Sequence, residues 1–158
     1  MSVQRLTHIG LCVSDLDRSR AFYTTVLGFA EVGGLRISGA TVDSLLGLTD
    51  ADVDARYVER DGFRLELIQF RSPGHRGEAQ ARPMNLLGLT HLSLRVADLD
   101  ATIARISEAG GAVLPESRGA HPERGTRFVM AIDPDGTRLE LIEAPGDPSR
   151  IPQFPRPE

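Results

Sequence analysis

The chain contains an internal repeat, and this limits the folds open to it. Residues 6–17 read LTHIGLCVSDLD and residues 89–100 read LTHLSLRVADLD, with eight of the twelve positions identical. Residues 61–68, DGFRLELI, match residues 135–142, DGTRLELI, at seven of eight positions. Two ordered matches of this quality indicate two copies of one structural unit.

Each copy is predicted to fold as a strand, a helix and three further strands, because apolar residues alternate or run together there. In the first copy, strands are expected at 6–13, 29–37, 53–59 and 63–70. In the second copy, they are expected at 89–96, 112–114, 126–132 and 137–143. The first helix begins after Asp15 or Asp17 and ends at Gly28,. The second helix covers about 98–109.

The first copy has nine more residues than the second between its matched blocks. They include an apolar stretch from Val42 to Leu48, which predicts a short helix that covers a pocket or contacts a second chain. One copy alone would leave a sheet face bare, so the two copies are expected to pair. The fold class is therefore α+β, with two tandem βαβββ modules whose curled mixed sheets form a cleft. The expected parts are 1–70 (first module), 71–88 (linker), 89–144 (second module) and 145–158 (proline-rich C-terminal tail).

Composition excludes several classes of function. The formal net charge of −4 and the pI near 5.6 argue against nucleic acid as a partner,. No apolar run approaches the ~20 residues of a membrane span, and the N-terminal segment lacks the regions of a signal peptide. We expect a cytoplasmic protein without a membrane partner. Cys12 is the only cysteine and is interpreted as an apolar strand residue rather than a catalytic thiol,.

Two histidines and two glutamates recur at equivalent positions of the repeat. His8 and His91 lie in the first strands, and Glu66 and Glu140 lie in the last strands. Because side chains alternate along a strand, all four face away from the helices. A buried glutamate must be paired, hydrogen-bonded or bound to metal, so a structural ion pair with an arginine remains the alternative. Two imidazoles and two carboxylates suit one divalent ion, Ni, Co, Zn, Mn or Fe, which would make the cleft metal-binding.

Other polar residues are candidates for substrate binding. Arg64 and Arg138 each stand two positions before a glutamate, where they would pair with the carboxylate or bind an anionic substrate. Tyr57 and Met130 are candidates for lining a pocket. The remaining histidines, His75 and His121, are expected in exposed loops.

Two motifs carry a resemblance to a known family. The pattern His-x4-Val-x-Asp-Leu-x2-Ser-x2-Phe-Tyr-x3-Leu-Gly-Phe covers His8 to Phe29, and Asp-Pro-Asp-Gly-x3-Glu-Leu covers Asp133 to Leu141. Both resemble the vicinal oxygen chelate superfamily, which includes glyoxalase I, methylmalonyl-CoA epimerase, ring-cleaving dioxygenases, fosfomycin-resistance enzymes and bleomycin-binding proteins. The resemblance spans about residues 5–144. It implies that His8, Glu66, His91 and Glu140 hold the metal, a set similar to that of bacterial glyoxalase I.

The resemblance implies a metal-dependent lyase or isomerase for a small 2-oxo or thioester substrate, acting through a metal-chelated enediolate. Glu140 is the first choice for the catalytic base and Glu66 the second. The alternatives are an Fe(II) ring-cleaving dioxygenase and a non-catalytic small-molecule binding protein of the resistance type. Glyoxalase I enzymes hold a glutathione carboxylate with an arginine four residues after the first histidine. Here that position is Cys12, which argues against glutathione as a cofactor, although Arg95 stands at the equivalent place in the second copy and could serve in a pseudo-symmetric site. The resemblance also implies a homodimer.

Overall fold

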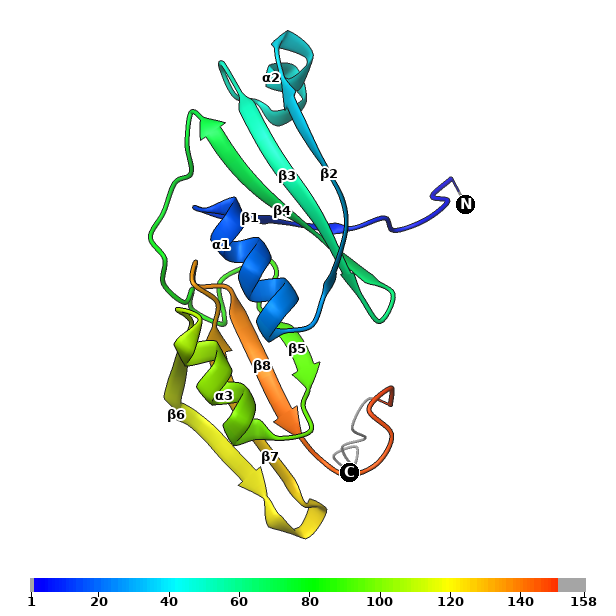
Figure 1. Cartoon of the computed structure of the whole chain (residues 1–158), viewed down its shortest axis with the longest axis vertical. Helices are drawn as coiled ribbons and strands as arrows, with labels where there is room; N and C mark the ends of the chain where they lie inside the picture. Colours follow the sequence, from blue (N-terminus) through cyan, green and yellow to red (C-terminus); the bar gives the residue numbers. More distant parts are fainter. Residues whose placement is uncertain (1, 151–158) are drawn as a thin grey trace.

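A computed structural model of the chain, which describes residues 2–150, shows two four-stranded mixed sheets (Figure 1). The first sheet contains β1 (Ile9–Cys12), β2 (Ala30–Ser38), β3 (Asp52–Arg60) and β4 (Phe63–Ser72). The second sheet contains β5 (Leu92–Arg95), β6 (Ala112–His121), β7 (Thr126–Ile132) and β8 (Arg138–Glu143). The helices are α1 (Leu16–Ala21), the π-helical turn η1 (Phe22–Val26), α2 (Ala40–Leu46), α3 (Leu99–Glu108) and the 3₁₀ turn η2 (Pro122–Arg124).

The two sheets have the same topology. Their strand orders are β1-β4-β3-β2 and β5-β8-β7-β6. The parallel pairs are β1 with β4 and β5 with β8, and all other neighbouring strands are antiparallel. This confirms the α+β class and the tandem βαβββ arrangement, with α2 as an addition to the first module (β1 to β4). The second module comprises β5 to β8.

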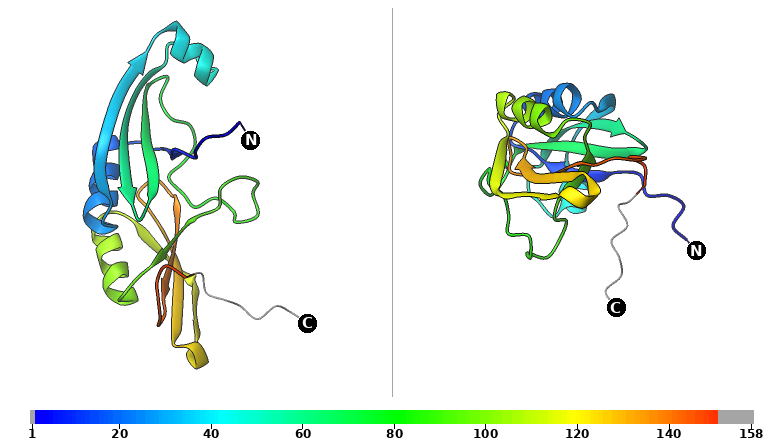
Figure 2. Two further views of the ribbon diagram at one scale, coloured as in Figure 1. Left: turned by 90° about the vertical axis from the view of Figure 1, so that its right-hand side faces the viewer. Right: turned by 90° about the horizontal axis from the view of Figure 1, so that it is seen from below.

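The sheets lie next to each other and do not close into a barrel (Figures 1 and 2). Helices α1 and α3 run along one side of the molecule, and η1 packs against α3. The N-terminal segment and the linker between the sheets project from the opposite side (Figure 2). The sheet faces opposite the helices are therefore left for a site. Among residues 2–150, no helix has the length and apolar character needed to cross a membrane.

Local sequence explains the helix ends. The side chain of Asp15 accepts a hydrogen bond of 2.9 Å from the backbone N–H of Arg18, and Asp98 caps α3 in the same way,. The π turn ends at Val26 and is followed, after Leu27, by Gly28, whose φ of +72° favours glycine,. Phe22 and Tyr23, the first two residues of this turn, are both buried in the core.

One apolar core lies between the helices and both sheets. As the alternation predicts, Leu65 and Leu67 of β4 and Leu139 and Leu141 of β8 are buried on the helix side,. Ile106 of α3 is fully buried as well. This burial fixes the opposite side chains of β4 and β8, including both glutamates, on the face away from the core.

Three expectations about elements need correction. Strands β1 and β5 are shorter than predicted and begin directly after the histidines, because the N-terminal approach to each strand leaves the sheet for solvent. Strand β6 is longer than 112–114 and continues to residue 121 after a register shift,. His121 is therefore exposed at a strand end rather than in a loop, whereas His75 lies in an exposed loop as expected.

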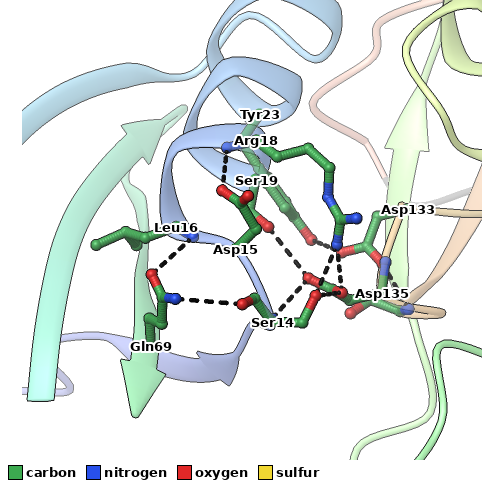
Figure 3. A network of polar contacts seen from close by, with 10 residues as sticks. Ser14, Asp15, Leu16, Arg18, Ser19, Tyr23, Gln69, Asp133 and Asp135 are labelled. Carbon is green, nitrogen blue, oxygen red and sulfur yellow. Dashed lines mark hydrogen bonds and ion pairs between the residues drawn. The ribbon is translucent and has the colours of Figure 1, made fainter. Parts of the chain in front are cut away.

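A polar network joins the two modules (Figure 3). Tyr23 donates a hydrogen bond from its hydroxyl to Asp133, in the turn before β8. Asp135 of the same turn accepts hydrogen bonds from Ser14 and Arg18 of the first module. Burial raises the pKa of Asp133,. The pKa of Asp135 is lowered, because the hydrogen bonds from Ser14 and the charge of Arg18 outweigh the desolvation that acts in the other direction,.

Candidate metal centre

The first pair of candidate ligands, His8 and Glu66, is held at the start of β1. Glu66 lies in β4 opposite Gly10 of β1, and the Nε2 atom of His8 is 3.1 Å from the Oε2 atom of Glu66. The hydroxyl of Tyr57 in β3 donates a 2.8 Å hydrogen bond to the other oxygen, Oε1. The Tyr57 ring also packs edge-on against the His8 ring, with centroids 5.3 Å apart.

The second pair, His91 and Glu140, repeats this placement in the second sheet. Glu140 of β8 lies opposite Ser93 of β5, and the Nε2 atom of His91 is 3.5 Å from the Oε2 atom of Glu140. The Ser93 hydroxyl donates a 2.6 Å hydrogen bond to the same oxygen. Each glutamate is therefore held by one hydroxyl, from a different neighbouring strand in each module.

Both histidines have a threonine hydroxyl at the far ring nitrogen. Thr7 Oγ1 lies 3.1 Å from His8 Nδ1, and Thr90 Oγ1 lies 2.9 Å from His91 Nδ1. When Nδ1–H donates to the threonine, Nε2 carries a lone pair toward a carboxylate. An imidazole Nε2 with a lone pair and a carboxylate oxygen are both acceptors, so they lie this close favourably only with a proton or a cation between them,. The donor set thus fits a divalent ion held by Nε2 and carboxylate oxygens.

The structure brings together each pair but does not bring the two pairs together within one chain. Over residues 2–150, no group of three or more His, Cys, Asp or Glu side chains is placed to hold one ion. The reason is that the modules lie next to each other through their helices and turns, with the sheets not closed around a common space. The expectation that all four ligands converge inside a single chain is therefore not met.

The candidate arginines contact groups other than the candidate glutamates. Arg64 forms a 2.7 Å ion pair with Glu59 across β3 and β4. Arg138 donates to the backbone carbonyl of Arg82 in the linker. Both lie on the glutamate face, as predicted, but neither pairs with the candidate ligands.

Arg95 binds the segment that follows β8. Its Nη2 donates to the backbone carbonyls of Ala144 and Pro145 at 2.7 Å each. Its Nε atom is buried without a hydrogen-bond partner among the described residues. The side chain lines a hollow of about 200 Å³ together with Arg124 and Asp147.

Tyr57 and Ser93 are the residues around the pairs whose roles sequence reasoning missed. Tyr57 was a candidate for lining a pocket, and the structure places it on both members of the first pair. Burial and the hydrogen bond to Glu66 raise the pKa of Tyr57,. The signal for Tyr57 was its position in the strand that pairs with β4 across the Asp61-Gly62 turn, where counting back from the turn gives the register,.

Comparisons with known proteins agree with the fold. A family model described as the Glyoxalase/Bleomycin resistance protein/Dioxygenase superfamily matches residues 5–141. A solved structure of a glyoxalase family protein from Bacillus cereus superposes with a TM-score of 0.78 at 21 % identity, covering 92 % of this chain and 97 % of that one.

Two relatives have named activities. The probable lactoylglutathione lyase of Vibrio cholerae is 34 % identical over 149 residues, which cover 90 % of this chain and 93 % of the relative. The 2-epi-5-epi-valiolone epimerase of an Actinomyces species is 33 % identical over 149 residues, which cover 87 % of this chain and 78 % of the relative. The similarity to both extends over most of the chain.

Proposed function

The chain belongs to the Glyoxalase/Bleomycin resistance protein/Dioxygenase superfamily, and on this basis we propose that it is a divalent-metal-dependent lyase or isomerase. Its substrate is a small 2-oxo compound or thioester. The observation that carries the proposal is the repeated placement of an imidazole Nε2 beside a carboxylate Oε2, at 3.1 Å in the first pair and 3.5 Å in the second. Relatives named as a lyase and as an epimerase support this class of reaction.

A complete site requires two chains, because one chain separates its pairs. In a twofold dimer, the first pair of one chain meets the second pair of its partner, and the two resulting sites are equivalent. The proposed protein is therefore a homodimer in which each site takes one pair from each chain.

Exposed apolar side chains next to the pairs favour this assembly. Leu6 and Leu89 stand two residues before the histidines and are 79 % and 70 % exposed, and Leu87 in the linker is 94 % exposed. The segments that carry them project from the side of the sheets away from the helices (Figure 2). Large apolar side chains that are exposed close in sequence to a polar site are typical of an interface.

In this dimer the metal would be held by His8 and Glu66 of one chain and by His91 and Glu140 of the other. When bound, the ion would supply Lewis acidity toward the substrate oxygens. Glu140 is proposed as the base that accepts a proton from the carbon beside a substrate carbonyl and returns it to the neighbouring carbon. With a side-chain exposure of 30 %, Glu140 is more accessible than Glu66 at 15 %.

Mixing two inactive variants tests the shared site. The His8→Ala/Glu66→Ala variant lacks the first pair, and the His91→Ala/Glu140→Ala variant lacks the second. After chain exchange, a heterodimer holds one intact site and one empty site, so an equal mixture should bind Co²⁺ at about a quarter of the wild-type level. Neither variant alone should bind it with wild-type affinity. A mixture that binds no more than its components would exclude a site shared in this way.

A substrate screen tests the reaction. The metal-loaded protein is assayed with hemithioacetals of 2-oxo aldehydes, with epimerisable acyl-CoA thioesters and, by oxygen uptake, with catechols. Metal-dependent turnover of a hemithioacetal or a thioester is the expected result. Iron-dependent oxygen uptake with a catechol would replace the proposal by a dioxygenase. The absence of metal binding by the wild-type chain would end the metal-dependent interpretation.

A further inference from the structure

We propose that Tyr57 is a positioning residue of the metal centre, which holds Glu66 and His8 in place before the ion arrives. This inference rests on the proposed metal site and assigns a role to a residue outside the ligand set. It predicts that the first pair makes the larger contribution to metal affinity, and that this difference originates in a single phenolic hydroxyl.

The two modules differ at the positions that contact the glutamates. On the β3 side, Tyr57 stands opposite Glu66, whereas the equivalent position opposite Glu140 is Met130. On the other side, Gly10 stands opposite Glu66, whereas Ser93 stands opposite Glu140. The repeat therefore retains the ligands but changes the residue that supports each carboxylate.

The support of Glu66 is the more complete. Tyr57 binds Oε1 while Oε2 faces His8, so both carboxylate oxygens are occupied. The same tyrosine ring packs edge-on against the His8 imidazole, and Tyr57 thus contacts both members of the first pair. Rotation of either ligand would break one of these contacts, which makes the pair preorganised for metal.

The support of Glu140 leaves more freedom. Ser93 and His91 both approach Oε2, and no hydrogen bond to Oε1 occurs among the described residues. Ser93 itself is exposed, and no ring packs against His91 in the part of the chain that the structure describes. A carboxylate bound through one oxygen can rotate about that contact, so the second pair is the less constrained one.

Three variants separate the hydroxyl from the ring and from the matched hydroxyl of the other module. Tyr57→Phe removes the hydrogen bond to Glu66 but keeps a ring beside His8, and Tyr57→Leu removes both. Ser93→Ala removes the hydroxyl that holds Glu140. Co²⁺ affinity is measured by competition with a chelator, and the visible spectrum of bound Co²⁺ reports the ligand geometry. Thermal unfolding of the metal-free proteins checks that each variant folds.

Tyr57→Phe is expected to raise the Kd for Co²⁺ by about 10- to 100-fold, the usual effect of losing a hydrogen bond to a metal ligand. Tyr57→Leu should raise it at least as much. Ser93→Ala should raise it less than Tyr57→Phe does, because Ser93 and His91 approach the same oxygen of Glu140 and Ser93 contacts no imidazole ring. A Co²⁺ spectrum changed by Tyr57→Phe, with unfolding of the metal-free protein unchanged, would support positioning over general stabilisation.

Two results would overturn the inference while leaving the metal site intact. One is a wild-type Kd in Tyr57→Phe, and the other is a loss of affinity in Ser93→Ala as large as in Tyr57→Phe. A wild-type chain that binds no Co²⁺ would instead overturn the proposed function on which the inference rests.

Discussion

The hydroxyl of Tyr23 donates a hydrogen bond of 2.9 Å to Oδ2 of Asp133, and this contact joins the first module to the turn that precedes β8. The other oxygen of Asp133 accepts from the backbone N–H groups of Asp135 and Thr137. The turn is therefore shaped by its own backbone, and it is fixed to the neighbouring module by this phenol together with the contacts of Ser14 and Arg18 to Asp135. Since β8 carries Glu140, this contact helps to set where the second pair lies relative to the first module.

Removal of the Tyr23 hydroxyl should reduce stability. Tyr23 and Asp133 are almost completely buried, so Tyr23→Phe leaves an oxygen of Asp133 without its donor. The expected loss in the free energy of unfolding is about 1–3 kcal/mol, measured by urea denaturation. Thr25→Ala, which removes an exposed hydroxyl from the same helical turn, is the control and should cost much less. Equal losses in the two variants would contradict the role given to Tyr23.

Stability should depend on pH through Asp135. Its pKa is lowered in the folded state, so the folded state binds fewer protons than the unfolded state as the pH falls,. The stabilisation from this group is present above its unfolded pKa of about 4 and is lost as the pH falls through the folded value. The stability difference between wild type and Asp135→Asn should therefore shrink from pH 7 to pH 3 in urea titrations.

Two further variants serve as comparisons for the pH dependence of Asp135→Asn. Glu108→Gln changes an exposed carboxylate at the end of α3 and should leave the pH profile unchanged. For Asp133→Asn, the stability of wild type relative to the variant should change with pH in the opposite direction. The reason is that the pKa of Asp133 is raised, so folding favours its protonated form,. A constant difference between wild type and Asp135→Asn over the whole range would refute the assignment.

The two glutamates should respond differently to replacement by glutamine. Glu140→Gln should lower kcat by about 10²–10⁴-fold, as the loss of a general base does, while the protein still binds metal. Glu66→Gln should chiefly weaken metal binding, because it alters the carboxylate that Tyr57 and His8 hold. Metal content by elemental analysis and kcat with a substrate from the screen decide between these outcomes. Full turnover by Glu140→Gln would remove this residue from proton transfer.

The dimer should depend on the apolar residues near the histidines. Leu89→Asp places a charge on a side chain that is 70 % exposed in the single chain and would be buried in the proposed interface,. Light scattering should show a shift from dimer to monomer, with a parallel loss of Co²⁺ binding. Leu45→Asp, on α2 and 78 % exposed, is the matched control and should stay dimeric. Dissociation by Leu45→Asp alone would move the interface to α2.

Much of each module follows from local sequence. The faces of β4 and β8 follow from alternation, and the helix starts follow from Asp15 and Asp98, because these signals depend on residues a few positions apart,. The short helix expected near Val42 to Leu48 is present as α2. The Asp61-Gly62 turn is present as well, with positive φ at both residues,.

Two features were not predicted from the sequence: the partner of Arg64, which depends on strand register, and the separation of the two His/Glu pairs, which depends on how the modules are arranged. Arg64 stands two residues from Glu66, yet its partner is Glu59, which lies opposite it in the neighbouring strand β3. Face alternation along one strand does not identify this partner, whereas the register counted from the Asp61-Gly62 turn does. The separation of the two pairs was missed for a similar reason. Alternation says which face a side chain occupies, but not whether two sheets of one chain face each other.

The separation of His8 and Glu66 from His91 and Glu140 has a consequence for anyone who assays this protein. If a centre is assembled only when two chains meet, then turnover per milligram should fall on dilution and recover on concentration, even though every molecule stays folded. A weak signal at nanomolar protein would then report dissociation rather than a poor catalyst.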